Sequence, residues 1–389
     1  MDAFDKYYSA LPASDQAQFM KLVERYNKAS ALGTACHDPA ILSLPHHQRF
    51  KVFGASDAEI AIWERFAPNA FKDAARTDVG RLEIMGTMLN QYPLLGRGMY
   101  QGNPILLMDM ALRMMIAKQR FHYFQTTDAL EGMLKETDFG EDLEARWFIP
   151  PYPCVYIEFG QTRCSHLRLL DETTGEHIVE GCYLISGDIH PYNDLSVDPV
   201  RGYDLIVFGS PVDKSNGIFD DTFFQVGIPI FDETASMAEI IQKTMNHDSD
   251  SFPEITRRNG PAIRAIIEHI AKALTYINMP DARRQDCKEG SLAAKSLAAI
   301  KNPAKREKAQ RKAAAQYNRI IVGPDQNPLL MTAHSHGQGV RPHFRRGHFR
   351  QQAHGPKLTL RRPLWIQPML IGKDRLDGPV ESKNYVVTN

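Results

Sequence analysis

The chain has 389 residues, of which 43% are apolar and 24% are charged, close to the average for globular proteins. This length allows a substantial buried core and indicates two or three domains or subdomains. The formal net charge is zero, so the whole molecule has no charge-driven preference for nucleic acid or membrane, and any such preference must be local.

The cysteines and the N-terminus indicate a cytoplasmic protein. The five cysteines are an odd number and none has Cys-x-x-Cys spacing, which is typical of free thiols in a reducing compartment. The N-terminus lacks the positive start and apolar run of a signal peptide. The most apolar stretch, residues 105–117, is interrupted by Asp109 and Arg113 and is far shorter than the roughly 20 residues that span a membrane. We therefore expect no membrane contact.

Residues 1–148 have the pattern of a helical region. Apolar side chains recur at helical spacing after Ser14, which predicts an amphipathic helix there. Ser56 and Glu59 have the spacing of a capping box, which predicts a second helix start. Asn103 precedes a proline, which suits the first turn of a third helix.

This helical region is also rich in methionine. A methionine-rich surface can form an adaptable groove for a peptide, but methionine more often fills gaps in a core. We favour the core interpretation for Met85, Met88, Met108, Met110, Met114 and Met115.

Residues 149–232 carry strand patterns. Three prolines within residues 149–153 exclude a helix and mark a boundary. Turn signals follow around Gly175 and at Asn216-Gly217, the dipeptide that most favours a short hairpin. Strands are predicted at residues 154–159, 167–170, 177–186, 203–208 and 223–230. Together they predict an antiparallel sheet.

Helical patterns return in residues 233–320. Helices are predicted at residues 233–245 and 262–277, and the second has a continuous apolar stripe. His269 lies beside that stripe, and we interpret it as a packed or surface residue, not a ligand. The predicted fold is α+β, with four regions: helical residues 1–148, an antiparallel β region at 149–232, a helical region with a basic helix at 233–320, and a basic His/Arg-rich β segment at 321–389.

The charge of residues 301–373 departs from that of the rest of the chain. This segment holds fifteen Lys and Arg residues against Glu307 and Asp325, a net charge of about +13. A segment of this density suits neutralisation of phosphate groups. The expected contacts with RNA or an acidic partner are Lys305, Arg306, Arg311, Lys312, Arg341, His343, Arg345, Arg346, His348, Arg350, Arg361 and Arg362.

The basic segment has two halves. Residues 303–316 are rich in Ala, Lys and Arg and predict a basic helix, which is either a solvated helix or an RNA-facing one. Residues 340–368 predict a β-ribbon in which Arg346, His348 and Arg350 form one cationic row. Phe349, Trp365 and Ile366 are expected on the opposite face.

Four chemistries remain open for this segment. Arginine density and aromatic platforms suit binding to RNA or to an acidic partner. His343 and His348 could instead act as the acid and base of a ribonuclease. A zinc site at His334, His336 and His343 is disfavoured, because no Cys, Asp or Glu lies nearby. In the fourth hypothesis the arginines have a structural role and stabilise the domain by forming ion pairs with acidic residues elsewhere in the chain.

Three segments resemble a known family. The first is Arg341-Pro-His-Phe-Arg-Arg-Gly-His-Phe-Arg, followed by Gly355-Pro and Arg361-Arg-Pro-Leu-Trp-Ile-Gln-Pro. The others are Ala273-Leu-Thr-Tyr-Ile-Asn-Met-Pro-Asp-Ala-Arg-Arg and Tyr317-Asn-Arg-Ile-Ile-Val-Gly. Together they are similar to a family of phage- and plasmid-borne proteins that includes a type V-A anti-CRISPR. The resemblance covers roughly residues 262–373.

The resemblance implies an unusual activity. The anti-CRISPR of this family lowers production of the type V-A effector nuclease by recognising the nascent effector polypeptide and triggering loss of its mRNA during translation. It implies a nascent N-terminal peptide as partner, with ribosome and mRNA as further expected partners, in the cytoplasm of a bacterial host cell. We favour a binding protein that is not an enzyme, with no cofactor, no metal and no catalytic residues.

Two alternatives remain beside that activity. The first is an RNA-binding ribonuclease using the C-terminal histidines, and the second is a phage accessory or structural protein. Because a short unfolded peptide needs a preformed groove or sheet edge, we expect the peptide site on the methionine-rich helices or on the sheet within residues 154–230. A chain of residues 1–300 is then expected to bind the peptide without lowering its mRNA.

Overall fold

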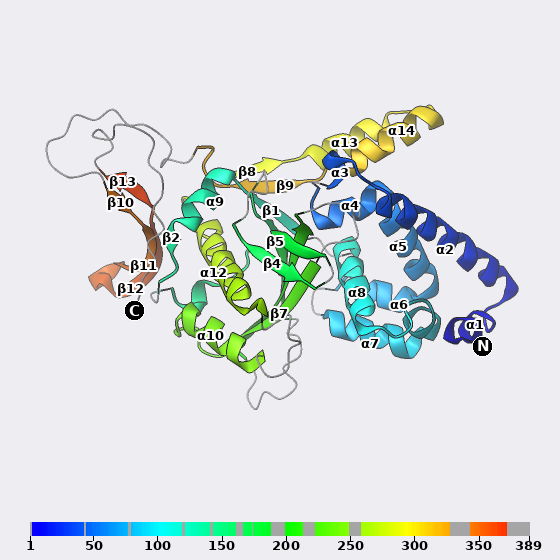
Figure 1. The fold of residues 1–389 in the computed structure, drawn as a ribbon, viewed down its shortest axis with the longest axis horizontal. Helices are drawn as coiled ribbons and strands as arrows, with labels where there is room; N and C mark the ends of the chain where they lie inside the picture. The colour runs from blue at the N-terminus through cyan, green and yellow to red at the C-terminus, as the bar shows by residue number, and fades with distance from the viewer. Residues whose placement is uncertain are drawn as a thin grey trace.

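The computed structural model describes residues 2–42, 44–76, 79–118, 121–140, 143–160, 166–172, 174–187, 199–212, 222–248, 258–326 and 343–371. It confirms the predicted α+β class. Figure 1 shows N-terminal helices at one end, a sheet with its own helices in the middle, and a β-hairpin at the other end. No helix among the described residues is long and apolar enough to cross a membrane.

The N-terminal part is a layer of helices. They are α1 (Ala3–Tyr8), α2 (Ala13–Thr34), α3 (Pro39–Leu42), α4 (His46–Val52), α5 (Ala55–Phe66), α6 (Pro68–Asp73), α7 (Arg81–Gln91), the π-helix η1 (Leu94–Met99) and α8 (Pro104–Lys118). Asn103 caps α8 as predicted, because its Oδ1 accepts a hydrogen bond from the N–H of Ile105 at 2.9 Å. The predicted capping box is wrong: α5 begins after Gly54, so Ser56 lies inside the helix.

The methionines fill the core of this layer, as the composition favours. Met88, Met110 and Met114 are completely buried, and Met108 and Met115 nearly so. Met88, Met110, Met114 and Met115 pack with Trp63 and the apolar face of the sheet in one cluster. The expectation that these methionine side chains could form a peptide groove is therefore wrong, because they are buried.

The central sheet contains the predicted strands and three that the sequence did not indicate. Its strands are β1 (His122–Thr126), β3 (Cys154–Glu158), β4 (Arg168–Asp171), β5 (Gly175–Ser186), β6 (Arg201–Pro211), β7 (Thr222–Ile230), β8 (Arg284–Cys287) and β9 (Arg319–Val322). Their order is β7-β6-β5-β3-β1-β9-β8, with β4 paired to β5. The predicted Asn216-Gly217 turn lies outside the described residues.

The predicted antiparallel pairing is confirmed from β3 to β7, but the whole sheet is mixed. β1 runs parallel to β3 and to β9, and β8 closes the edge antiparallel to β9. β1 comes from the region expected to be helical, and β8 and β9 come from the second helical region. All three are only four or five residues long, too short for a clear period in the sequence.

Both faces of the sheet are covered, as the strand sequences require. In β3, Val155 and Ile157 belong to one apolar cluster and Tyr156 to the other. The first cluster packs under α9 (Asp128–Lys135), α10 (Met237–Asp248) and α12 (Gly260–Ile277), and the second packs under the N-terminal helices. Burial on both faces explains the continuous apolar runs.

The remaining elements are those of the basic segment and the short elements next to it. They are β2 (Thr137–Asp138), the 3-10 turn η2 (Ala145–Trp147), α13 (Glu289–Ala298), α14 (Pro303–Ala314), β10 (His343–Arg345), β11 (Gly347–His354), the 3-10 turn η3 (Pro356–Leu358), β12 (Leu360–Ile366) and β13 (Met369–Ile371). α14 is the predicted basic helix, and β11 and β12 form the predicted antiparallel ribbon. β11 also pairs with β2, which attaches the ribbon to the body.

Candidate functional site

The β11–β12 hairpin is fixed to the body by its aromatic face. Phe349 and Trp365 face each other across the two strands, are 2% and 7% exposed, and stack with ring centroids 5.9 Å apart. Trp365 also contacts the ring of Tyr276 edge-on at 5.3 Å and donates its indole N–H to Oγ1 of Thr137 at 3.1 Å. The hairpin is therefore a rigid extension of α12 and β2.

The opposite face of the hairpin carries the predicted cationic row, with one correction. His348 and Arg350 alternate with Phe349, as expected for a strand. Ile366, however, lies opposite His348 in the register and so shares its face. The prediction that Ile366 packs with Trp365 is wrong because neighbouring residues of a strand point to opposite faces.

Most arginines of the hairpin and of the adjoining strand β10 are available to a partner. Arg345, Arg350, Arg361 and Arg362 are exposed, and within the described residues none of them forms an ion pair. Arg346 is different, because its Nη1 lies 2.8 Å from Oδ1 of Asp138. Within the described part of the chain, Arg346 alone of these arginines fits the hypothesis that the arginines stabilise the domain by ion pairing. Because Arg346 and Asp138 are both exposed, their ion pair contributes little to stability.

The structure describes only some of the residues proposed for catalysis or zinc binding. Arg341, His334 and His336 lie outside the described residues, and His343 is described only by its backbone in β10. His348 is half-buried beside Ile366. Among the described residues no group of three or more His, Cys, Asp or Glu side chains could hold a metal ion.

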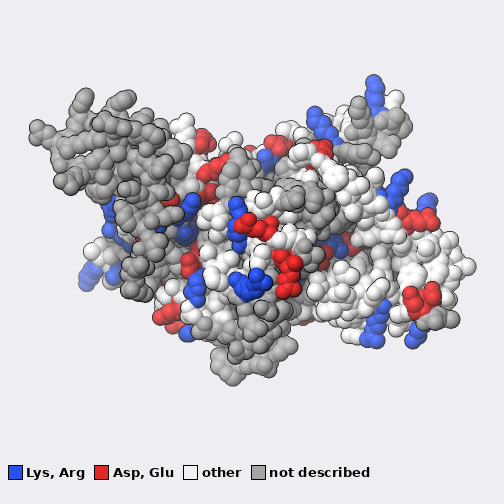
Figure 2. All heavy atoms as spheres, viewed as in Figure 1, with Lys and Arg blue, Asp and Glu red and all other residues white. Residues whose placement is uncertain are grey.

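The basic helix α14 lies far from the hairpin. Lys305, Arg306 and Lys312 are exposed, whereas the side chain of Arg311 is outside the description. α14 contacts α13 and α4, beside the N-terminal helices. Figure 1 shows α14 at the upper right and the hairpin at the left, and Figure 2, in the same view, shows Lys and Arg side chains at both places. The basic segment therefore forms two separate patches, not the single compact surface that the sequence suggested.

A third feature, which the sequence analysis missed, is the open edge at β8. In the part of the chain that the structure describes, β8 is the last strand of the sheet, and Arg284, Gln285 and Asp286 are exposed. The N–H of Gly323 donates to the carbonyl oxygen of Arg283 at 3.0 Å, which sets the alternation of the β8–β9 ladder. The backbone N–H and C=O groups of Arg284 and Asp286 consequently point away from β9, where an added strand could pair.

A cleft of about 770 Å³ lies next to this edge. It is lined by Gln48, Lys51, Asp57, Phe121, His122, Tyr123, Asp286, Cys287, Lys288, Gly290, Ser291, Ala314, Gln316, Tyr317, Asn318, Arg319 and Ile320. Its walls thus come from α4, α5, the start of β1, β8, the start of α13, the end of α14 and β9. Burial lowers the pKa of Lys51, against the opposing effect of Asp57.

A hydrogen-bond network gives the cleft a fixed polar wall. The buried carboxylate of Glu158 accepts from Nε2 of Gln125 at 2.9 Å and from the hydroxyl of Tyr317 at 2.7 Å. Arg319 donates its Nε–H to Oε1 of Gln125 and its Nη1–H to Oε2 of Glu289, both at 2.9 Å. The hydrogen bond from Arg319 lowers the pKa of Glu289. These groups hold donors, acceptors and an aromatic ring in place, as a peptide-binding surface requires.

Two buried polar side chains of α12 hold the elements around the hairpin. His269 is buried, as expected for a packed histidine, with Nε2 2.8 Å from Oε2 of Glu131. Lys272 donates from Nζ to the carbonyl oxygens of Leu134 at 2.8 Å and Thr137 at 3.0 Å. Burial lowers the pKa of Lys272 to about 8. Both residues therefore position α9 and β2, and neither lines the cleft.

The three segments quoted from the sequence meet in this part of the molecule. Tyr276 contacts Trp365 of the hairpin, and Tyr317 and Arg319 line the cleft beside β8. Gly323 has φ +120°, and a Cβ there would collide with Oγ1 of Thr127. The description of the matching family model is anti-CRISPR type V subtype A2 family, AcrVA2-like, and it covers residues 124–373. The chain belongs to this family.

The other comparisons add little. No curated protein matches the chain. A solved structure described as the crystal structure of AcrVA2 matches 80% of this chain and 97% of that chain, with 12% sequence identity and a TM-score of 0.43. The family match confirms the resemblance drawn from the sequence and gives this AcrVA2-like chain an anti-CRISPR function.

Proposed function

We propose that the chain lowers production of a type V-A CRISPR effector nuclease by binding the N-terminal segment of the nascent effector and promoting loss of its mRNA. The observation that carries this proposal is the family match over residues 124–373. The protein would act in the cytoplasm of the bacterial host cell, where the effector is translated.

The β8 edge is the proposed site for the nascent peptide. A chain leaving the ribosome is short, extended and unfolded, so its backbone groups are free to pair with an open strand. The outward N–H and C=O groups of Arg284 and Asp286 supply that strand, and the cleft beside it supplies pockets for side chains. This position replaces the methionine-rich helices, where five of the six methionine side chains are buried.

The basic hairpin is the proposed contact with RNA of the translating complex. Its arginines are exposed, and the packing of Phe349 against Trp365 holds the strands that carry them, so little backbone order must be created on binding. Peptide recognition and the effect on mRNA would then depend on separate surfaces. A chain of residues 1–300 cannot test this separation, because it lacks β9, an inner strand of the sheet.

The target of recognition can be determined by recoding the effector gene. Synonymous changes in its first codons are expected to leave its sensitivity to this protein intact, because the peptide is unchanged. Substitutions that change the encoded amino acids are expected to remove sensitivity. Effector mRNA is quantified in cells with and without the protein. Sensitivity that follows the nucleotide sequence regardless of the peptide would contradict the proposal and favour direct RNA readout.

Strand addition at β8 is tested by Asp286→Pro. Proline removes one outward N–H and suits an edge strand, so the β8–β9 ladder should persist. We expect at least tenfold weaker binding of a peptide corresponding to the effector N-terminus, measured by calorimetry, and loss of the effect on mRNA. Asp286→Ala is the matched control, since it removes the same carboxylate and keeps the N–H. Equal losses in the two variants would show that the carboxylate, not the backbone, is used.

A further inference from the structure

The N-terminal helices enclose a second cavity, away from the β8 edge. Its volume is about 970 Å³, within the usual size range of ligand sites. The lining residues lie on α1, α2, α4, η1, α8 and β6 and on residues next to these elements, and only Phe208 falls within the span matched by the family model. The cavity is therefore a feature separate from the proposed function.

The centre of the cavity carries more negative than positive charge. Arg113 binds Glu59 through two hydrogen bonds of 2.7 and 3.0 Å, and its Nη1 also contacts Oδ2 of Asp109. Two carboxylates thus share one guanidinium. Burial alone would lower the pKa of Arg113, but Asp109 and Glu59 outweigh it and raise that pKa well above its ordinary value. Within the described residues, one negative charge remains without a cation of its own.

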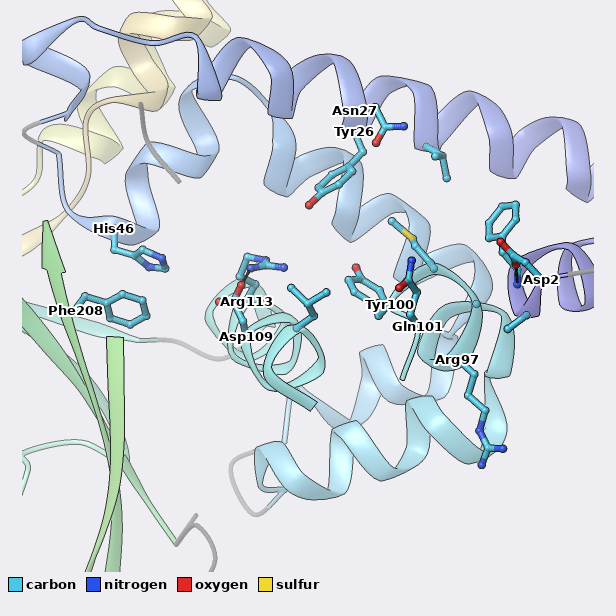
Figure 3. Close-up of a pocket in the computed structure, with 16 residues that line it drawn as sticks. Asp2, Tyr26, Asn27, His46, Arg97, Tyr100, Gln101, Asp109, Arg113 and Phe208 are labelled. Atoms are coloured by element: carbon cyan, nitrogen blue, oxygen red, sulfur yellow. Dashed lines mark hydrogen bonds and ion pairs between the residues drawn. The ribbon is translucent and has the colours of Figure 1, made fainter. Parts of the chain in front are cut away.

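The nearby polar groups do not supply that cation. Tyr100 donates its hydroxyl to Oε1 of Glu59 at 2.6 Å, a neutral contact. Burial, with a further contribution from Arg49, lowers the pKa of His46 to about 3, so this imidazole is neutral at physiological pH. Arg97 is exposed and points away from the other labelled side chains (Figure 3).

The surplus charge can be reached from the cavity and is flanked by aromatic rings. The side chain of Asp109 is 26% exposed, whereas that of Glu59 is almost completely buried. Figure 3 shows Tyr26 and Tyr100 on the same side of Asp109 and Arg113, and His46 with Phe208 on the other. A carboxylate with aromatic faces around it is the environment that stabilises an organic cation.

The cavity wall is also shaped in an unusual way. η1 is a π-helix, and it leads into Tyr100 and Gln101 at the cavity. The π-helix is rare in proteins, but where it does occur it is often at a functional site. Gln101 has φ +54°, which is uncommon for a residue other than glycine. A Cβ at Gly96 would lie 2.6 Å from the carbonyl oxygen of Met88, so this close packing needs glycine.

We propose that this cavity binds a primary ammonium group, carried by a lysine side chain of a peptide or by a free polyamine. The ammonium would lie against Asp109, where it balances the second carboxylate of the Arg113 cluster. The rings of Tyr26 and Tyr100 would contact the aliphatic chain next to it.

Calorimetry on the full-length protein with three probes tests this assignment. The probes are spermidine, the blocked peptide acetyl-Ala-Lys-Ala-amide, and the same peptide with its lysine acetylated. We expect at least one ammonium probe to bind and the acetylated peptide to fail. Binding of the peptide identifies a lysine side chain as a source of the cation, and binding of spermidine alone identifies a free polyamine. Failure of both ammonium probes, or equal binding of the acetylated peptide, would overturn the proposal.

Two variants place the binding in this cavity. Asn27→Lys introduces a competing cation at an exposed residue of α2 that lines the cavity, and is expected to weaken binding at least tenfold. Gln18→Lys, at an exposed residue of the same helix outside the lining, should leave affinity unchanged. Asp109→Asn should weaken binding by a similar factor, with the melting temperature measured to show that the fold persists. If Gln18→Lys weakens binding as much as Asn27→Lys, the cavity is not the site.

Discussion

Replacing Arg345, Arg350 and Arg362 together by glutamate is expected to abolish the effect on effector production while leaving the melting temperature within a few degrees. All three side chains are exposed and, within the described residues, form no ion pair, so their reversal removes no internal contact with a carboxylate. Each phosphate contact that is lost should weaken RNA association and lower its salt dependence by roughly one unit of slope. Effector mRNA levels and RNA binding at several salt concentrations give the measurement.

A matched control separates this effect from a change in overall charge. Lys21, Arg25 and Lys28 are exposed on α2, so their replacement by glutamate changes the net charge equally at the other end of the molecule. That control is expected to retain activity. The hairpin variant should still bind the effector peptide, because β8 is unchanged. A hairpin variant that unfolds, or one that still lowers effector mRNA, would contradict the proposed role of the hairpin.

Glu180→Ala is expected to destabilise the protein by about 3–5 kcal/mol. Glu180 is completely buried in β5 and accepts hydrogen bonds from Nη2 and Nη1 of Arg49 at 2.8 and 3.0 Å and from the N–H of His46 at 3.1 Å. Its removal leaves the guanidinium of Arg49, 2% exposed, without its carboxylate in a dry environment. Chemical denaturation of the two proteins measures the difference in unfolding free energy.

The double variant Arg49→Met, Glu180→Leu provides the control for that prediction. It removes both charges, so its cost should be smaller than that of Glu180→Ala despite the larger change. If Glu180→Ala lowers the unfolding free energy by less than about 1 kcal/mol, water or another group must balance the charge of Arg49 in that variant. This pair joins α4 to the sheet, so the result also measures how firmly the N-terminal helices are attached.

The sequence predicted those parts of the fold whose patterns are local. Of the strands between Cys154 and Ile230, β5, β6 and β7 are long, whereas the short β3 and β4 were marked by the prolines of residues 149–153 and by the turn at Gly175. The antiparallel hairpin follows from alternation within one short segment. β1, β8 and β9 were missed because each is short and takes its stability from neighbours far away in the chain. The error at Ile366 came from pairing it with Trp365 by hydrophobicity instead of by strand register.

The candidate site was harder to predict than the fold. Positive charge is visible in a sequence, so the exposed arginines of the hairpin were identified in advance. The β8 edge was not, because an open strand is defined by the absence of a neighbour, and Glu158, Gln125 and Tyr317 are separated widely in the chain. The segments shared with the family carried the signal that existed, because one ends at Arg284 of β8 and the other contains Tyr317 and Arg319 of the cleft.

The position of β9 between β1 and β8 also governs how this protein itself is made. The hydrogen bond between Arg319 of β9 and Gln125 of β1 joins residues 194 positions apart, so β1 is synthesised long before β9. Closing so long a loop costs entropy before any contact repays it, which slows folding. Until β9 is translated, β1 has an unpaired edge, and growing chains with such an edge tend to aggregate. Efficient production of this inhibitor should therefore depend on slow translation or on chaperones.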